Sequence, residues 1–190
     1  MNKKRVVVIG GTGLIGSRVV RILEAAGHDP VVAALETGVN TITGEGLSAV
    51  MKGADAVVDV SNAPSFEQRA VREFFETSGK NIARAEAQAG VRHHVLLSIV
   101  GSDRMPENGY FNAKVIQEGV AITSGIPFSI VRSTQFFEFL GGIAGGNTVA
   151  GVVRLSASPS AIIGFLPERL HAFRAAHPLV EIALYERSTA

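Results

Sequence analysis

The 190-residue sequence contains no cysteine and no tryptophan, and it has only two tyrosines. Without cysteine, the chain cannot form disulfides, use a thiolate in catalysis or bind a metal through sulfur. It also lacks the GxSxG, HExxH and GxxxxGK[ST] motifs. Their absence removes the commonest sequence arguments for a serine hydrolase, a zinc peptidase or a P-loop nucleotide hydrolase.

Charge is also scarce, since charged residues make up 18% of the chain and the net charge is +1. This balance gives no electrostatic reason to expect a nucleic acid or an anionic membrane as a partner. No apolar run approaches the roughly 20 residues that span a bilayer. We therefore expect a globular protein with no nucleic-acid or membrane partner, and we take the cytoplasm as its default location.

Hydrophobic periodicity alternates between strands and helices along most of the chain. We expect strands at residues 6–9, 30–35, 40–43, 56–60, 94–100 and 128–132, with helices at 14–26, 47–52, 65–89 and 110–123. The long helix at 65–89 has a potential break at Ser78 and Gly79. Repeated strand and helix units predict an α/β protein with a three-layer Rossmann fold: a mostly parallel sheet, the first strand central, and ligands at the carboxyl ends of the strands.

The alternation loses its register after Gly146. Beyond that point we expect a strand at 155–160, a helix at 162–176 and a strand at 180–185. The sequence thus predicts a Rossmann domain at residues 1–154. Residues 155–190 form a β-α-β-like tail, too small to be an independent domain.

The strongest local pattern is RVVVIGGTGLIG at residues 5–16, in which an apolar strand leads through spaced glycines into a helix. Glycines allow a sharp turn and leave the backbone bare, so its N–H groups and the helix N-terminus can hold a pyrophosphate. The alternative is a glycine-rich turn without a ligand. The predicted cofactor-binding residues of this loop are Gly10, Gly11, Thr12, Gly13, Leu14, Ile15 and Gly16.

Tyr110 and Lys114 are spaced as YxxxK, which places them on one face of a helix, one turn apart. A nearby ammonium favours the phenolate and lowers the pKa of a tyrosine, so that it can exchange a proton with a carbonyl or alcohol oxygen. Ser98 ends the fifth expected strand, and its hydroxyl could orient the same substrate oxygen. Alternatively, Ser98 bonds only to nearby backbone.

Acidic and polar residues follow three other strands. Glu36 lies where an acidic residue accepts from the adenosine ribose and repels a 2′-phosphate, which favours NAD over NADP. Glu45, Ser61 and Asn62 stand in loops along the cofactor's expected path. For all four residues, a solvated loop without a ligand stays an equal alternative.

Two adjacent histidines, His93 and His94, invite a metal hypothesis. Neighbouring residues on a strand point to opposite faces, so these two cannot bind one ion together. We therefore expect a structural role for them and no metal site.

Taken together, these residues resemble the short-chain dehydrogenase/reductase superfamily, and most closely its atypical NmrA-like, NAD(P)H-binding branch. The similarity covers about residues 3–142 and rests on the segments GGTGLIG, VVDVSNAPSFE, HHVLLSIVGSD, GYFNAK and IVRSTQFFEFLGG. It implies NADP or NAD as cofactor, Tyr110 as acid/base, Lys114 as its ribose-binding partner and Ser98 as a substrate-orienting group. Residues 133–136, which include Thr134, are expected near the nicotinamide.

The branch includes reductases of quinones and other carbonyls as well as sensors that do no chemistry. The resemblance therefore implies reduction of a small-molecule carbonyl or quinone. The alternatives are a redox sensor with a protein partner, or an inactive truncated or fused relic, and a homo-oligomer stays open.

Two features of this sequence differ from the usual pattern of the branch. Its members often carry Ser or Arg near the position of Glu36, and these residues suit the binding of NADP. They usually continue for about a hundred residues with a last strand and a substrate lobe, which we expect to be lacking here. Residues 155–190 instead resemble the start of the effector-binding domain of LysR-type regulators. No helix-turn-helix accompanies that segment, and the hypothesis that follows is a fused or frame-shifted reading frame.

Overall fold

The computed structural model describes residues 2–134, 136, 151–157, 170–171 and 180–186. The chain divides into two compact units, Met1–Thr134 and Gln135–Ala190. The strands of the first unit are β1 (Arg5–Ile9), β2 (Asp29–Ala33), β3 (Ala56–Asp59), β4 (His94–Ile99) and β5 (Phe128–Ser133). Its α-helices are α1 (Gly16–Ala25), α2 (Leu47–Met51), α3 (Gln68–Ala89) and α4 (Gly109–Thr123), and its two 3₁₀ turns are Leu35–Thr37 and Ser102–Arg104.

The five strands form one parallel sheet in the order β2-β1-β3-β4-β5. Strand β1 is an interior strand, and its residues Val6 to Ile9 are all buried, as expected for a strand covered on both faces. The order in which the chain adds strands reverses at β1, which pairs with β2 on one side and with β3 on the other. Open α/β sheets bind their ligands outside the carboxyl ends of the strands at such a switch point.

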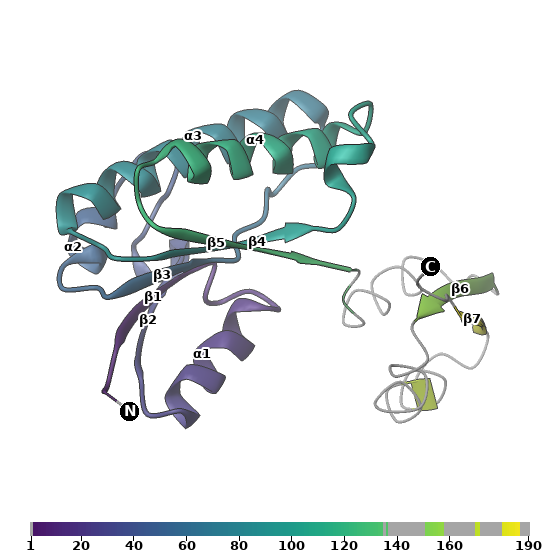
Figure 1. Cartoon of the computed structure of the whole chain (residues 1–190), viewed down its shortest axis with the longest axis horizontal. Coiled ribbons are helices and arrows are strands. Elements are labelled where there is room, and N and C mark those ends of the chain that lie inside the picture. The colour runs from purple at the N-terminus through teal and green to yellow at the C-terminus, as the bar shows by residue number, and fades with distance from the viewer. Residues whose placement is uncertain (1, 135, 137–150, 158–169, 172–179, 187–190) are drawn as a thin grey trace. The chain divides into compact units, whose positions relative to one another are not determined.

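Helices cover both faces of the sheet and complete the three layers predicted from the sequence. Figure 1 shows α3 and α4 along one face and α1 on the other. The main hydrophobic core lies on the α3 side, and its fully buried residues include Val7, Met51, Val57 and Ile82. None of the helices in the described part of the chain is long and apolar enough to cross a membrane.

The expected strand at residues 40–43 is wrong, because this segment is a turn. The Asn40 side chain accepts hydrogen bonds from the backbone N–H groups of Ile42 (2.9 Å) and Thr43 (3.2 Å). Asn81 of α3 donates to the carbonyl oxygens of Thr41 and Ile42. Local side-chain bonds of this kind compete with a strand ladder, so the apolar content of the segment was misleading.

Helix α3 runs without a break through Ser78 and Gly79, where the sequence allowed an interruption. A Cβ at Gly79 would lie 3.3 Å from a side-chain carbon of Val120 in α4. The glycine therefore serves the close approach of α3 to α4 rather than a helix break.

The second unit contains a parallel pair of strands, β6 (Gly151–Ala157) and β7 (Val180–Glu186). The strands expected at 155–160 and 180–185 correspond to these two, although β6 begins earlier than predicted and residues 158–160 lie outside the described residues. Of the helix expected between them, only residues 170–171 are described, and they are helical. Gly151 to Ala157 pair with β7 as one strand, and the compact units divide after Thr134. The domain boundary expected after residue 154 stays a prediction.

Candidate functional site

The glycine loop between β1 and α1 has space only for glycine at its critical positions. Gly10 has a φ of +77°, in the left-handed region. A Cβ at Gly16 would lie 2.1 Å from the carbonyl oxygen of Gly10, and one at Gly11 would lie 2.9 Å from that of Val8. Helix α1 begins at Gly16 with no acidic residue in its first turn and no side-chain cap. The bare backbone and uncapped helix N-terminus fit the pyrophosphate of a dinucleotide.

Glu36 lies beside this loop. It belongs to the 3₁₀ turn after β2, and the Thr12 hydroxyl donates to its Oε2 at 3.1 Å. The Thr37 hydroxyl accepts from the backbone N–H of Ala34 at 2.9 Å and so fixes the turn. The structure thus brings together Thr12 of the glycine loop and Glu36. Glu45 is exposed in the turn that precedes α2.

Ser61 and Asn62 connect the glycine loop to the predicted tyrosine. A Cβ at Gly10 would lie 3.1 Å from the Cα of Ser61, so the two backbones are in close contact. The Ser61 hydroxyl is buried and has no hydrogen-bond partner among the residues that the structure describes. The neighbouring Asn62 accepts a 2.7 Å hydrogen bond from the Tyr110 hydroxyl.

Tyr110 is held in the first turn of α4. The Asn108 side chain caps this helix by accepting from the N–H groups of Tyr110 and Phe111, each at 3.1 Å. The Tyr110 ring packs against Phe66, with 6.4 Å between centroids, and edge-on against Phe75 at 6.0 Å. Burial raises the pKa of Tyr110 above its ordinary value of 10. The structure therefore presents Tyr110 as a neutral phenol.

Lys114 shares a helix face with Tyr110, but its ammonium is directed elsewhere. The side chain is buried, and Nζ donates to the carbonyl oxygen of Leu97 at 2.8 Å and to Gln117. It also lies over the Phe75 ring, 4.6 Å from the centroid. Burial lowers the pKa of Lys114 to about 8, although Asp59 and Glu118 attract the charged form. The expected lowering of the tyrosine pKa by this ammonium is absent in the described structure, because the two polar groups face different partners.

Ser98 lies on the face of the sheet that α4 covers. It is 1% exposed, and its hydroxyl donates to Glu118 of α4. Arg132 of β5 binds the same carboxylate at 3.0 and 2.7 Å. The hydroxyl is therefore used within a network of β4, α4 and β5, and neither Tyr110 nor local backbone is its acceptor.

The segment after β5 is described only in part. Ser133 donates to the carbonyl oxygen of Ser98 at 3.3 Å, and Thr134 is exposed. Gln135 lies outside the described residues.

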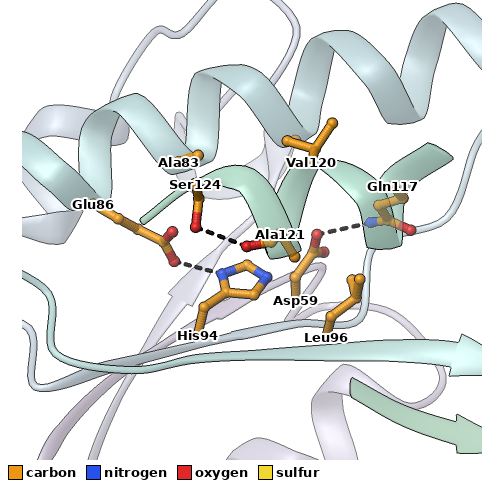
Figure 2. Close-up of a pocket in the computed structure, with 10 residues that line it drawn as sticks. Asp59, Ala83, Glu86, His94, Leu96, Gln117, Val120, Ala121 and Ser124 are labelled. Atoms are coloured by element: carbon orange, nitrogen blue, oxygen red, sulfur yellow. Dashed lines mark hydrogen bonds and ion pairs between the residues drawn. The ribbon is translucent and has the colours of Figure 1, made fainter. Parts of the chain in front are cut away.

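A buried polar cluster beneath α3 and α4 escaped the sequence reasoning (Figure 2). His94 Nδ1 lies 2.6 Å from Glu86, and Gln117 donates to Asp59 at 2.9 Å. These side chains line a small pocket between the sheet and the two helices. One signal in the sequence was Asp59, a carboxylate within the apolar strand AVVDV. Glu86 on α3 and Gln117 on α4 gave no such signal, because finding them requires knowing which face of each helix is buried.

The two histidines bond on opposite faces of the sheet. His93 bonds to Ser129 at 2.9 Å, whereas His94 faces α3. Burial lowers the pKa of His94, but its hydrogen bond with Glu86 and the charges of Glu86 and Asp59 outweigh that effect and raise it. Within the described residues, no group of three or more His, Cys, Asp or Glu side chains could hold a metal.

Comparison with known proteins agrees with this geometry. A family profile for NAD(P)H-binding domains matches residues 10–142. Photosystem II assembly factor Ycf39 from Synechocystis sp. is 28% identical over 150 residues, which cover 72% of this chain and 46% of that protein. The chain thus spans less than half the length of this curated relative.

Solved structures show the same fold at low identity. dTDP-4-dehydrorhamnose reductase from Bacillus anthracis, in complex with NADP, has a TM-score of 0.63 at 15% identity, covering 100% of this chain and 76% of its own. An NADPH-dependent quinone oxidoreductase from Escherichia coli has a TM-score of 0.52 at 17% identity, covering 80% and 55%. The LysR-like interpretation of residues 155–190 stays a prediction. The family match over residues 10–142 establishes that this chain belongs to the NAD(P)H-binding family, with NAD or NADP as its cofactor.

Proposed function

We propose that the protein is an NAD(P)H-dependent reductase of a small carbonyl compound or quinone, with Tyr110 as the proton donor. The observation that carries this proposal is the continuity from the glycine loop to the phenol. Ser61 contacts Gly10, and the next residue, Asn62, accepts the hydrogen bond of Tyr110. Two consecutive residues thus link the loop that would hold the cofactor to the Tyr110 hydroxyl.

The chain's own residues have distinct tasks in this reaction. The glycine loop binds the pyrophosphate, and Glu36 accepts from the adenosine ribose. When bound, the reduced nicotinamide supplies a hydride to the substrate carbon or quinone ring. The Tyr110 hydroxyl gives its proton to the substrate oxygen, and solvent then returns a proton to the phenolate. One hydride and one proton complete the reduction of either substrate; a quinone that takes the hydride on a ring carbon becomes the hydroquinone when that carbon loses a proton to solvent and the second oxygen gains one. The raised pKa of Tyr110 keeps the proton on the phenol until the oxygen becomes basic.

The test is a Tyr110→Phe variant, assayed by NAD(P)H oxidation at 340 nm with a panel of quinones and carbonyl compounds. Phenylalanine keeps the ring packing on Phe66 and Phe75 and removes only the hydroxyl. We expect a fall in turnover of about a hundredfold or more, with cofactor affinity unchanged by fluorescence titration. Unchanged turnover would remove Tyr110 from the reaction.

A non-catalytic redox sensor is the second candidate. The observation that favours it is the engagement of Lys114 and Ser98 with Leu97, Gln117 and Glu118 rather than with the Tyr110 hydroxyl. A sensor would bind NADH or NADPH and report its state to a protein partner. Cofactor binding without turnover on the whole panel would favour this reading, whereas absence of binding to folded protein would reject both candidates. The expected cytoplasmic location also stays a prediction.

A further inference from the structure

The Asn62 carboxamide has a defined orientation. Its Oδ1 lies 2.7 Å from the Tyr110 hydroxyl and 3.0 Å from the backbone nitrogen of Ala63. A backbone N–H can only donate, so the atom that faces it must be the carbonyl oxygen of the side chain and not its NH₂ group. Because the same oxygen meets the phenol, the Tyr110 hydroxyl is the donor in this contact.

The segment that carries Asn62 is anchored on both sides. The N–H of Ser61 donates to the buried carboxylate of Asp59 at 2.9 Å. On the other side, Ala63 is 7% exposed and belongs to the hydrophobic cluster that includes Phe75 and borders Tyr110. Asn62 itself is exposed, but the backbone around it is fixed. The fold therefore fixes the position of the Asn62 Oδ1 acceptor, although the side chain that carries it is exposed.

Lys114 provides no competing interaction with the phenol. Its Nζ is held by Leu97 and Gln117, and the Phe75 ring contacts both the ammonium and the Tyr110 ring. A hydrogen bond donated by the neutral form of a group favours that form. Asn62 thus acts in the same direction as burial on the protonation of Tyr110.

We propose that Asn62 is a positioning residue for the reduction: its carboxamide oxygen holds the Tyr110 hydroxyl as a neutral proton donor until a substrate oxygen takes its place as acceptor. The substrate carbonyl and the Asn62 carbonyl are both hydrogen-bond acceptors. When the substrate replaces Asn62 as the acceptor, the phenol therefore stays the donor and keeps its proton directed at a carbonyl oxygen. The role in reduction rests on the proposed function, whereas the effect of Asn62 on Tyr110 does not.

The scarcity of tyrosine makes a direct test simple. The full chain, labelled with ¹³Cζ-tyrosine, gives two signals, one each from Tyr110 and Tyr185, and a Tyr185→Phe variant assigns them. Titration of these signals measures the pKa of Tyr110 without any assay of activity. Circular dichroism at each pH defines the range in which the protein stays folded.

Two substitutions of Asn62 should act in opposite directions. In Asn62→Ala the loss of an acceptor for the neutral phenol should lower the pKa of Tyr110 by about 0.5 to 1. Asn62→Asp keeps an acceptor and adds a negative charge, so it should raise that pKa. Damage to the local structure alone would expose the phenol to water in both variants and lower the pKa in both.

Phe66→Ala is the matched control, because Phe66 is 85% exposed and covers the Tyr110 ring without accepting its proton. We expect this variant to move the pKa of Tyr110 less than Asn62→Ala does. An equal fall in the two variants, or no fall in Asn62→Ala, would overturn the proposal. If the pKa values move as expected but the wild type reduces no substrate, the positioning effect stands and the proposed reaction fails.

Discussion

Lys114 offers a quantitative test of the site, because the structure buries its ammonium at a measurable cost in stability. Burial lowers its pKa from the ordinary 10.5 to about 8. That difference corresponds to about 3 kcal/mol between the charged and neutral forms. Its origin is the loss of water around the ammonium, which the hydrogen bonds to Leu97 and Gln117 and the attraction of Asp59 and Glu118 offset only in part.

The sign of the pH dependence follows from the two pKa values. Below about pH 8, Lys114 is charged in both the folded and unfolded states, so folding bears the full cost of burial. Between about pH 8 and 10.5, the folded protein has released this proton and the unfolded chain keeps it. Stability therefore rises with pH across that window. A Lys114→Met variant has no such proton and lacks this rise.

The assay is urea unfolding followed by far-UV circular dichroism at pH 7, 8, 9 and 10. Relative to Lys114→Met, the wild type should gain about 2 to 3 kcal/mol in free energy of unfolding between pH 7 and 10. Lys80→Met is the matched control, since Lys80 lies on α3 with a side chain that is 59% exposed, and its curve should run parallel to the wild type. Parallel curves for wild type and Lys114→Met would refute the reasoning.

Three further perturbations test other parts of the site. Glu36→Ser removes a negative charge beside the glycine loop. In fluorescence titrations, NADPH affinity should rise by about fivefold, equivalent to about 1 kcal/mol, and NADH affinity should fall. Unchanged affinities would place Glu36 outside the cofactor site. Gly16→Ala puts a Cβ 2.1 Å from the Gly10 carbonyl oxygen and should reduce both thermal stability and cofactor binding. The control is Gly119→Ala in α4, whose Cβ would meet nothing within 4 Å and which should leave both properties intact. Equal effects of the two substitutions would contradict the steric argument. The raised pKa of His94 contributes stability that is complete below about pH 6.5 and is lost as pH rises through the pKa of the folded state. His94→Gln should therefore flatten the fall in the free energy of unfolding above pH 6.5. An unchanged slope would exclude the His94–Glu86 pair as the source of that fall.

Most of the fold followed from local patterns in the sequence. Five of the six strands expected before residue 135 form, because buried parallel strands require continuous apolar runs that are visible without any partner. The exception, residues 40–43, failed because the Asn40 side chain bonds to the backbone two and three residues ahead, a choice that hydrophobicity does not report.

The glycine loop was equally accessible from the sequence. Its constraint is steric and lies within a few residues, since Gly16 approaches Gly10 and Gly11 approaches Val8. The spacing of Tyr110 and Lys114 on one helix face was also local and correct. The direction of their polar atoms was not predicted, because it depends on Asn62 in the loop after β3, on Leu97 of β4 and on Gln117 of α4.

The sequence by itself therefore determined the parallel α/β architecture, the glycine loop for which we propose phosphate binding, and the helix position of the residues for which we propose proton exchange. Only the tertiary structure decided three of the acceptors: Asn62 for Tyr110, Glu118 for Ser98, and Leu97 for Lys114. Apolar strand runs and glycine turns can both be recognised from residues that are near neighbours in the chain. The partner of a buried donor is instead fixed by the packing of elements far apart in sequence, such as Asn62 after β3 and Tyr110 at the start of α4.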